Sequence, residues 1–431
     1  MRHAPRQRQH YGHSGLNHMG HADFTGLTLQ INCAACHGLL TWAEREGLLQ
    51  KKRLVTQLKA SPSDQRTNKE ETLLAVTLWA LECLGVSKAS HDFWLGWSGG
   101  PEKKLSRDWQ LGHLCRTAPS LLREASKDRV PVRQAAMYHC YEYLLLHPDQ
   151  NRLDGVDGYV DDRSEDIKLS ELVYHHNFKQ PLNELINQIV ATHTGQEPLT
   201  IIDIGAGSGG MLLDVAKSLR LTTKNVNFVA IDPSNVARRA CRKTAILNPE
   251  IKMHVAAGSI ENPTEIIQTL KEKSIPNEHC IVLAKAALHD RTLGSMFPTE
   301  NEREEVNEEP QGKQDNEYNY VYRDENWKQV RKHQVMYDMV TVLNAWKRAL
   351  PDVRLIILES HIIPARTINE QINRIALLPA YLSHSLSAQY MLSGSDHHKA
   401  TQQARFKKNK FIPLQVMPDQ NPLMSITFLE D

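Results

Sequence analysis

A buried-type strand that runs directly into a glycine-rich turn constrains this chain most. Residues 199–204 (Leu-Thr-Ile-Ile-Asp-Ile) form a short, largely β-branched apolar run, and residues 205–210 (Gly-Ala-Gly-Ser-Gly-Gly) end it. Such a run is typical of a strand with both faces covered, and glycines let the backbone turn sharply into the helical pattern of 211–219. The sequence therefore predicts a strand–turn–helix unit whose turn a ligand can approach closely.

The same alternation of strand and helix continues after this unit, which favours a parallel sheet covered by helices on both faces. Only the short turn 418–422 separates the last two apolar runs, so we expect them to form an antiparallel hairpin. The predicted strands are 199–204, 226–231, 251–257, 280–288, 353–359, 411–416 and 423–429, with helices at 211–219, 264–272 and 327–350. The fold class is therefore α/β.

Composition excludes several functional classes. Lys and Arg number 51 against 50 Asp and Glu, so no global field favours nucleic acid or an anionic membrane. The apolar runs are far shorter than the ~20 residues of a membrane helix. The first 23 residues lack an apolar signal segment, and the seven cysteines are odd in number and scattered. We expect a cytoplasmic protein with reduced thiols.

The spacing of the glycines separates two kinds of cofactor. Dinucleotide sites place a pyrophosphate at a helix N-terminus and typically use Gly-x-Gly-x-x-Gly, whereas this turn is Gly-x-Gly-x-Gly. Asp203 precedes the turn, and its charge would repel a pyrophosphate. A cofactor with an ammonium group suits this position better.

Residues 202–209 resemble the first motif of class I S-adenosylmethionine-dependent methyltransferases. The resemblance covers about residues 199–429 and implies a Rossmann-like, seven-stranded methyltransferase sheet with a closing antiparallel hairpin. It implies that Asp232, at the end of the second strand, accepts hydrogen bonds from the ribose hydroxyls. Family members commonly carry an acid after the third strand, where this chain has Ser259. The expected cofactor-binding residues are Asp203, Gly205, Gly207, Gly209, Asp232 and Ser259.

A second resemblance concerns catalysis. Residues 285–291 (Lys-Ala-Ala-Leu-His-Asp-Arg) are similar to the Leu-His-Asp segment of small-molecule O-methyltransferases of secondary metabolism. The resemblance implies that His289 deprotonates an acceptor hydroxyl, with Glu359 or Asp290 as the supporting carboxylate. A neutral alcohol is a poor nucleophile, and a histidine oriented by a carboxylate can remove its proton during attack.

Two alternatives to O-methylation stay open. A His–Glu pair also serves the C-methyltransferase domains of polyketide synthases, which implies C-methylation of a carrier-bound acyl group. His384 and Gln389 could join His289 or Asp290 around a divalent metal ion in such an enzyme, or could lie on the outer face of an amphipathic helix. The other alternative is a catalytically silent methyltransferase-like interaction protein, which the acidic insertion and the missing acid favour.

Residue composition and the spacing of apolar residues divide the chain into three parts. Residues 1–25 are rich in histidine and predict a flexible arm, and apolar residues recur at helical spacing between 27 and 185. We expect a helical lid and dimerisation domain at 26–195, with a homodimer as one possible assembly. The S-adenosylmethionine-binding domain is expected at 196–431, and its acidic stretch 298–326 predicts a solvated insertion. The sequence does not identify the acceptor.

Overall fold

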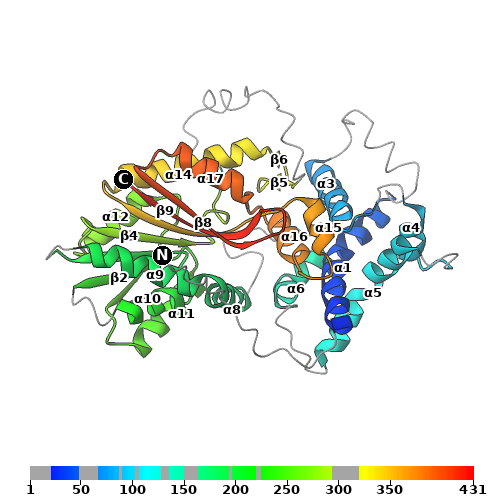
Figure 1. The fold of residues 1–431 in the computed structure, drawn as a ribbon, viewed down its shortest axis with the longest axis horizontal. Coiled ribbons are helices and arrows are strands. Elements are labelled where there is room, and N and C mark those ends of the chain that lie inside the picture. The colour runs from blue at the N-terminus through cyan, green and yellow to red at the C-terminus, as the bar shows by residue number, and fades with distance from the viewer. Residues whose placement is uncertain are drawn as a thin grey trace, which may run out of the picture.

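A seven-stranded mixed sheet forms the core of one half of the molecule, and helices α1, α3, α4 and α5 lie in the other half (Figure 1). The computed structural model describes residues 21–47, 67–86, 90–101, 106–127, 135–149, 164–193, 197–219, 225–293 and 320–431. The strand order is β3-β2-β1-β4-β7-β9-β8. The strands are β1 (Leu199–Ile204), β2 (Val226–Ile231), β3 (Met253–Ala256), β4 (Cys280–Lys285), β7 (Arg354–Ser360), β8 (Lys408–Val416) and β9 (Pro422–Glu430).

The order of the strands leaves a place for a ligand beyond the carboxyl ends of the central strands. Strands β1, β2 and β3 follow one another outward, and the chain then returns to place β4 on the other side of β1. Open parallel sheets bind ligands beyond the carboxyl ends of the strands at such a switch point. β9 pairs antiparallel with both β7 and β8, which confirms the predicted closing hairpin.

Alternate residues of the strands face two different layers of helices, as the two-residue period of a strand requires. Ile202 and Ile204 of β1 pack in one cluster, and Leu199 and Ile201 pack in the other. Figure 1 shows the two layers on opposite faces of the sheet. One layer contains α9 (Lys179–Thr192), α10 (Gly210–Leu219) and α11 (Asn235–Leu247); the other contains α12 (Pro263–Glu272), α14 (Lys332–Ala349) and α17 (Gly394–Gln403).

The described part of the chain before β1 is helical, as the spacing of apolar residues predicted. α1 begins at His21, inside the stretch assigned to the arm, and residues 1–20 lie outside the described residues. The elements are α1 (His21–Arg45), α3 (Asn68–Cys83), α4 (His91–Trp97), α5 (Arg107–Lys127), α6 (Ala136–Cys140), α7 (Glu142–Leu146), α8 (Ser164–Val173) and the π-helix η1 (Tyr174–Phe178).

Two helices of the sheet-containing half connect it to these N-terminal helices. α15 (Ala365–Gln371) and α16 (Leu378–Leu386) pack against α1 and α3 (Figure 1). Asn32 of α1 is fully buried, and its amide group donates to the carbonyls of Ile372 and Ile375 at 2.8 and 3.0 Å. Its side-chain oxygen accepts the N–H of Leu378 at 3.1 Å. One side chain of α1 thereby fixes the start of α16.

We expect Asn32→Leu to lower the free energy of unfolding by about 2–4 kcal/mol, because it strands three buried backbone groups without partners. Urea unfolding followed by circular dichroism measures the change. Asn326→Ala, at an exposed turn position, is the matched control and should stay within about 0.5 kcal/mol of the parent. Equal stability of the two variants would contradict this role for Asn32.

The prediction of one helix over 327–350 is wrong at its start. Residues 322–330 instead form a small hairpin, β5 (Tyr322–Arg323) and β6 (Gln329–Val330), and α14 begins at Lys332. Asp324 makes the turn, because its Oδ1 accepts the N–H groups of Asn326 and Lys328 at 2.9 and 2.8 Å. The predicted acidic insertion lies outside the described residues up to 319, and its last residues belong to this hairpin.

The predicted strand 280–288 is also too long. β4 ends at Lys285, and the next residue, Ala286, has a φ of 55° in the left-handed region. A non-glycine residue in this conformation breaks a strand. His289 consequently lies in a loop beyond the sheet, which lets it turn into the space above β4.

The cysteines are free thiols, as their scatter predicted. All seven lie in described residues, and Cys33 and Cys36 are buried on α1. Burial raises the pKa of the Cys36 thiol well above its usual value, so the thiol stays protonated and packs as an apolar side chain. Among the described residues, no helix combines the length and the apolar character needed to cross a membrane.

Candidate active site

A cavity of about 390 Å³ lies beyond the carboxyl ends of β1, β2, β4 and β7. Its volume is typical of a small-molecule site. Its wall contains the predicted residues Gly205, Gly207, Asp232, Ser259, His289, Asp290, His384 and Gln389. The other three predicted residues, Asp203, Gly209 and Glu359, lie behind this wall.

The glycine turn presents open backbone to the cavity. Gly205 and Gly207 have φ values of 72° and 56°, which favour glycine. A Cβ added at Gly207 would find no atom within 4 Å among the described residues. The Gly207 N–H donates to Asp232 Oδ2 at 2.9 Å, which ties the turn after β1 to the end of β2. A ligand can therefore lie directly on this turn.

Gly209 has a different surrounding. Its φ is 78°, and an added Cβ would lie 2.7 Å from Cys241 Sγ of α11. The structure thus places Gly209 against the packed side of the turn, where a side chain would push α10 away from α11. This close approach of two helices accounts for the glycine without contact with a ligand.

Asp203 is a buried acid beneath the turn. Its residue exposure is 1%, and neither carboxyl oxygen has a hydrogen-bond partner among the described residues. Burial raises its pKa to about 7, against the opposing effect of Lys285. An unpaired acid at this depth favours a nearby positive charge.

Asp232 directly follows β2 and lines the cavity. Its Oδ1 accepts the N–H of Ser234 at 2.8 Å, and Oδ2 accepts the N–H of Gly207. Each carboxylate oxygen has two lone-pair directions, so further acceptor capacity remains on a residue that lines the cavity. The open turn, the buried acid and this carboxylate together fit S-adenosylmethionine, whose ammonium and ribose groups need such partners.

A buried histidine–carboxylate pair lies beside the turn. His289 Nδ1 is hydrogen-bonded to Oε1 of Glu359, the last residue but one of β7. The exposed fractions of His289 and Glu359 are 6% and 3%. Burial alone would lower the pKa of His289, but the charge of Glu359 and its hydrogen bond outweigh burial and raise it. Glu359 also accepts the N–H of Ser360 at 3.1 Å, which orients the carboxylate.

The loop that carries His289 is anchored from its far side. Arg291 is 3% exposed, and its guanidinium donates to Asp338 Oδ2 of α14 at 2.5 Å and to the carbonyl of Val335 at 2.7 Å. The backbone carbonyl of His289 accepts the N–H of Tyr390 at 2.6 Å. The histidine is therefore held by α14 and by the segment after α16.

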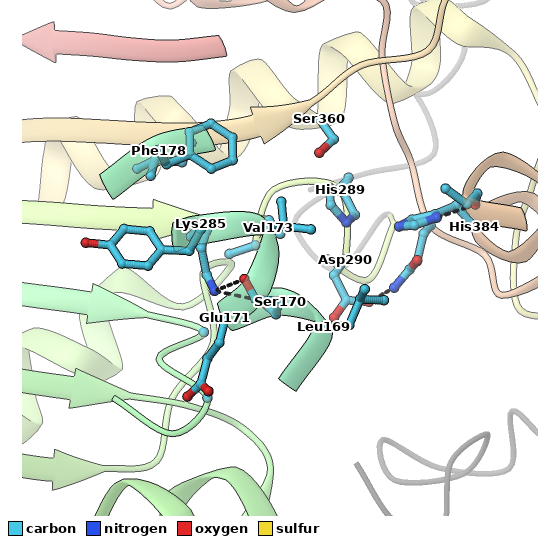
Figure 2. Close-up of a pocket in the computed structure, with 18 of the residues that line it drawn as sticks. Leu169, Ser170, Glu171, Val173, Phe178, Lys285, His289, Asp290, Ser360 and His384 are labelled. Carbon is cyan, nitrogen blue, oxygen red and sulfur yellow. Dashed lines mark hydrogen bonds between the residues drawn. The ribbon is translucent and has the colours of Figure 1, made fainter. Parts of the chain in front are cut away.

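Asp290 and His384 lie at the same end of the cavity as His289 (Figure 2), and Gln389 also lines the cavity. Gln389 Nε2 donates to Asp290 Oδ1 at 2.6 Å, and the rings of His289 and His384 lie 5.0 Å apart. Asp290 thus pairs with Gln389, while Glu359 occupies the place beside His289. Among the described residues, no three His, Cys, Asp or Glu side chains form a group that could hold a metal ion.

Part of the cavity wall comes from α8 and η1, and sequence reasoning missed most of it. Figure 2 shows Lys285 of β4 beside Ser170 of α8, where its Nζ donates to Ser170 Oγ at 2.6 Å. Glu171 accepts a hydrogen bond from the hydroxyl of Ser208 in the glycine turn. Tyr174 and Phe178 of η1 also line the cavity. No spacing in the sequence marks Ser170 or Glu171, because their helix lies far from the turn along the chain.

Comparisons with known proteins agree with this geometry. The family model of the AprA MT2-like domain matches residues 159–428, more than half of the chain. No curated protein sequence matches the chain.

Several solved structures are similar to this chain at low sequence identity. The DszA carbon methyltransferase is 12% identical, with 95% of this chain and 91% of that chain covered and a TM-score of 0.49. The citrinin polyketide synthase CMeT domain is 13% identical, with 92% and 97% covered and a TM-score of 0.44. An O-methyltransferase family 2 protein from Planctomyces limnophilus DSM 3776, in complex with apigenin, is 12% identical, with 95% and 94% covered and a TM-score of 0.40.

The family match covers both the glycine turn and the histidine–carboxylate pair. The chain therefore belongs to the AprA MT2-like domain family and is a class I S-adenosylmethionine-dependent methyltransferase.

Proposed function

We propose that this enzyme transfers a methyl group to a hydroxyl oxygen of a small molecule, with His289 as the general base. The observation that carries the proposal is the buried hydrogen bond between His289 Nδ1 and Glu359 Oε1, beside the glycine turn. A carboxylate only accepts hydrogen bonds, so Nδ1 carries the proton and Nε2 of the neutral ring keeps its lone pair. His289 lines the cavity, so this lone pair is available to an acceptor there.

The chemistry needs a base at this place. When bound, S-adenosylmethionine supplies an electrophilic methyl group on a positively charged sulfur. His289 Nε2 takes the proton of the acceptor hydroxyl as the oxygen forms its bond to the methyl carbon, and the electrons of the broken carbon–sulfur bond stay on sulfur. Glu359 stabilises the imidazolium that results, because its charge and its hydrogen bond raise the pKa of His289.

The remaining wall supports a mainly apolar acceptor. Met137 and Tyr141 reach the cavity from the N-terminal helices, and Leu377 and Ala380 reach it from around the start of α16. Apolar walls with a few polar groups at one end are typical of sites for small organic ligands. We infer that the region 26–195 acts as the lid over this site, and that the acceptor carries its hydroxyl on an otherwise apolar body.

Transfer of a labelled methyl group tests the proposal. The enzyme is incubated with carbon-13-methyl S-adenosylmethionine and a panel of phenols, enols and carrier-mimicking β-ketothioesters, and the products are identified by mass spectrometry and NMR. We expect the label on oxygen. A product labelled only on carbon would overturn the choice of acceptor atom and leave the role of His289 open to test.

C-methylation of a carrier-bound acyl group is the second candidate. The observation that favours it is the polar end of the cavity, where Asp290 holds the amide group of Gln389, whose second N–H could be donated to an acyl carbonyl. Treatment with a chelator discriminates the metal-assisted form. Loss of turnover that returns on addition of one divalent metal would favour it, and unchanged turnover would exclude it.

Asp232→Asn should weaken the binding of S-adenosylhomocysteine about tenfold or more, because it removes a charged acceptor of hydroxyl hydrogen bonds. Isothermal titration calorimetry measures the affinity. Asp352→Asn, at an exposed position before β7, is the control and should bind as the parent does. Unchanged affinity in Asp232→Asn would remove this residue from the cofactor site.

A further inference from the structure

The outer face of α11 is basic, although positive and negative charges nearly balance over the whole chain. The helix contains Arg238, Arg239, Arg242 and Lys243 and no acid. Arg238 serves the fold, because its guanidinium donates to the carbonyl of Asp232 at 2.7 Å. The other three side chains are exposed, and none of them forms an ion pair with another described residue. Three cations on one helix are therefore directed at whatever meets this face.

Two aliphatic side chains lie beside these cations. Ile246 and Leu247 are 77% and 70% exposed, the highest values among the large apolar side chains of the described residues. They follow Lys243 by three and four residues, so they lie next to it on the helix surface. They are also the last residues of α11. The outer face of α11, which consists of the three cations and this pair, thus ends in a protruding apolar tip.

The opposite face of α11 fixes the helix to the sheet. Ala237 and Cys241 are buried there, and the helix contacts β3, which is an edge strand. Figure 1 shows α11 at the margin of the sheet-containing half, apart from α1 and α5. Ala237 also lines the cavity. The start of α11 therefore borders the active site, and its end carries the apolar tip.

We propose that the outer face of α11 binds the surface of an anionic lipid membrane. The three cations attract the anionic headgroups, and Ile246 and Leu247 insert at the boundary between headgroups and acyl chains. A bilayer deforms around a protruding tip, whereas a protein partner would need a pocket of matching shape. A nucleic acid would bind the cations through its phosphates and leave the aliphatic pair in water. The combination of charge and apolar tip therefore favours lipid.

Membrane binding would bring the enzyme to its acceptor. This consequence rests on the proposed function, because an acceptor with an otherwise apolar body concentrates in a bilayer. The binding itself needs neither His289 nor an acceptor, so it can be measured without turnover.

Sedimentation with lipid vesicles tests the proposal. The enzyme is mixed with vesicles of phosphatidylcholine alone, or of two parts phosphatidylcholine to one part phosphatidylserine, and the bound fraction is measured after centrifugation. We expect binding to the phosphatidylserine vesicles to be at least about tenfold stronger, and to weaken as added salt screens the charges. Equal binding to the two compositions, or binding to neither, would overturn the proposal.

Removal of the charges tests whether α11 is the binding face. A variant with glutamine in place of all three cations of the outer face should bind the phosphatidylserine vesicles at least about tenfold more weakly. The matched control removes three exposed cations near β8, at the opposite edge of the sheet from β3, and should bind as the parent does. An equal loss in both variants would show that total charge attracts the vesicles, and the assignment to α11 would be wrong. The variants are Arg239→Gln/Arg242→Gln/Lys243→Gln and the control Arg405→Gln/Lys407→Gln/Lys410→Gln.

Removal of the apolar tip tests whether the partner is a lipid. Ile246→Ser/Leu247→Ser should keep the preference for phosphatidylserine but bind about tenfold more weakly or worse, because no apolar side chain enters the bilayer. Leu121→Ser, at an exposed position of α5, is the control and should bind as the parent does. Unchanged binding of the double variant would show that charge acts alone, as it would toward a nucleic acid or an acidic protein, and would overturn the membrane assignment.

The outcomes separate this inference from the proposed function. His289→Gln should bind vesicles as the parent does, whatever its turnover. If the parent fails to bind phosphatidylserine vesicles while the label is found on the oxygen of a free acceptor, the membrane assignment fails and the proposed function stands. If the label is found only on carbon while vesicle binding depends on α11, the reverse holds.

Discussion

His289→Gln should lower turnover by about 10²- to 10⁴-fold and leave the affinity for S-adenosylhomocysteine unchanged. Glutamine keeps a polar side chain of similar reach, but its amide cannot take up a proton at neutral pH. The expected loss is the usual contribution of a general base to a rate. Methyl transfer from a labelled donor measures turnover, and calorimetry measures binding of the product.

A second histidine gives the control for this variant. His176 lies exposed on η1 and is not part of the described cavity wall, so His176→Gln should act at the parent rate. Turnover of His289→Gln at the parent rate would show that another group accepts the proton. Loss of cofactor binding together with turnover would instead show that the substitution disturbs the glycine turn.

Glu359→Gln should lower turnover by about 10²- to 10⁴-fold and shift the pH profile. In the parent enzyme Glu359 raises the pKa of His289 against the effect of burial, and activity rises as the imidazole loses its proton with increasing pH. Without the charge of Glu359, burial dominates and lowers that pKa. The rising limb of the profile should therefore move to lower pH, while the maximal rate falls.

The two effects in Glu359→Gln distinguish a catalytic partner from a packing residue. Loss of packing alone would reduce the amount of folded enzyme without moving the limb of the pH profile. Glu370→Gln removes an exposed carboxylate that pairs with Arg366 on α15, and its profile should coincide with that of the parent. A limb that stays in place in Glu359→Gln would contradict the influence of Glu359 on His289.

The sequence predicts most of the sheet because its signals are local. Three signals depend only on residues that are adjacent in the sequence: the β-branched runs, the glycine turn and the short link before the last strand. The start of α14 escaped prediction because the turn at Asp324 depends on side-chain hydrogen bonds that apolar periodicity does not record. The end of β4 escaped it because Ala286 adopts a left-handed conformation that its residue type disfavours.

The residues of the cavity also fall into those that local sequence signals predict and those that they do not. His289 and Asp232 follow strands, so the position of their motifs places them at the edge of the sheet. Glu171 and Glu261 carry no comparable signal, since the first lies on a helix before the sheet and the second lies two residues beyond the expected position of an acid. The packing of α8 against the glycine turn brings Glu171 to the cavity, and the hydrogen bond with Thr292 holds Glu261 there.

The buried contact of Asn32 with the start of α16 has a consequence for how such enzymes diversify. The glycine turn and Asp232, which form the expected cofactor site, follow strands of the sheet. Ala380 and His384 line the same cavity but belong to α16, whose start is fixed by Asn32 of α1. Changes among the N-terminal helices can therefore reshape what is methylated while the machinery that delivers the methyl group stays intact. Exchange of residues 21–146, which carry α1 to α7, between relatives is a rational route to new acceptors, provided that the segment around residues 372–378 travels with them.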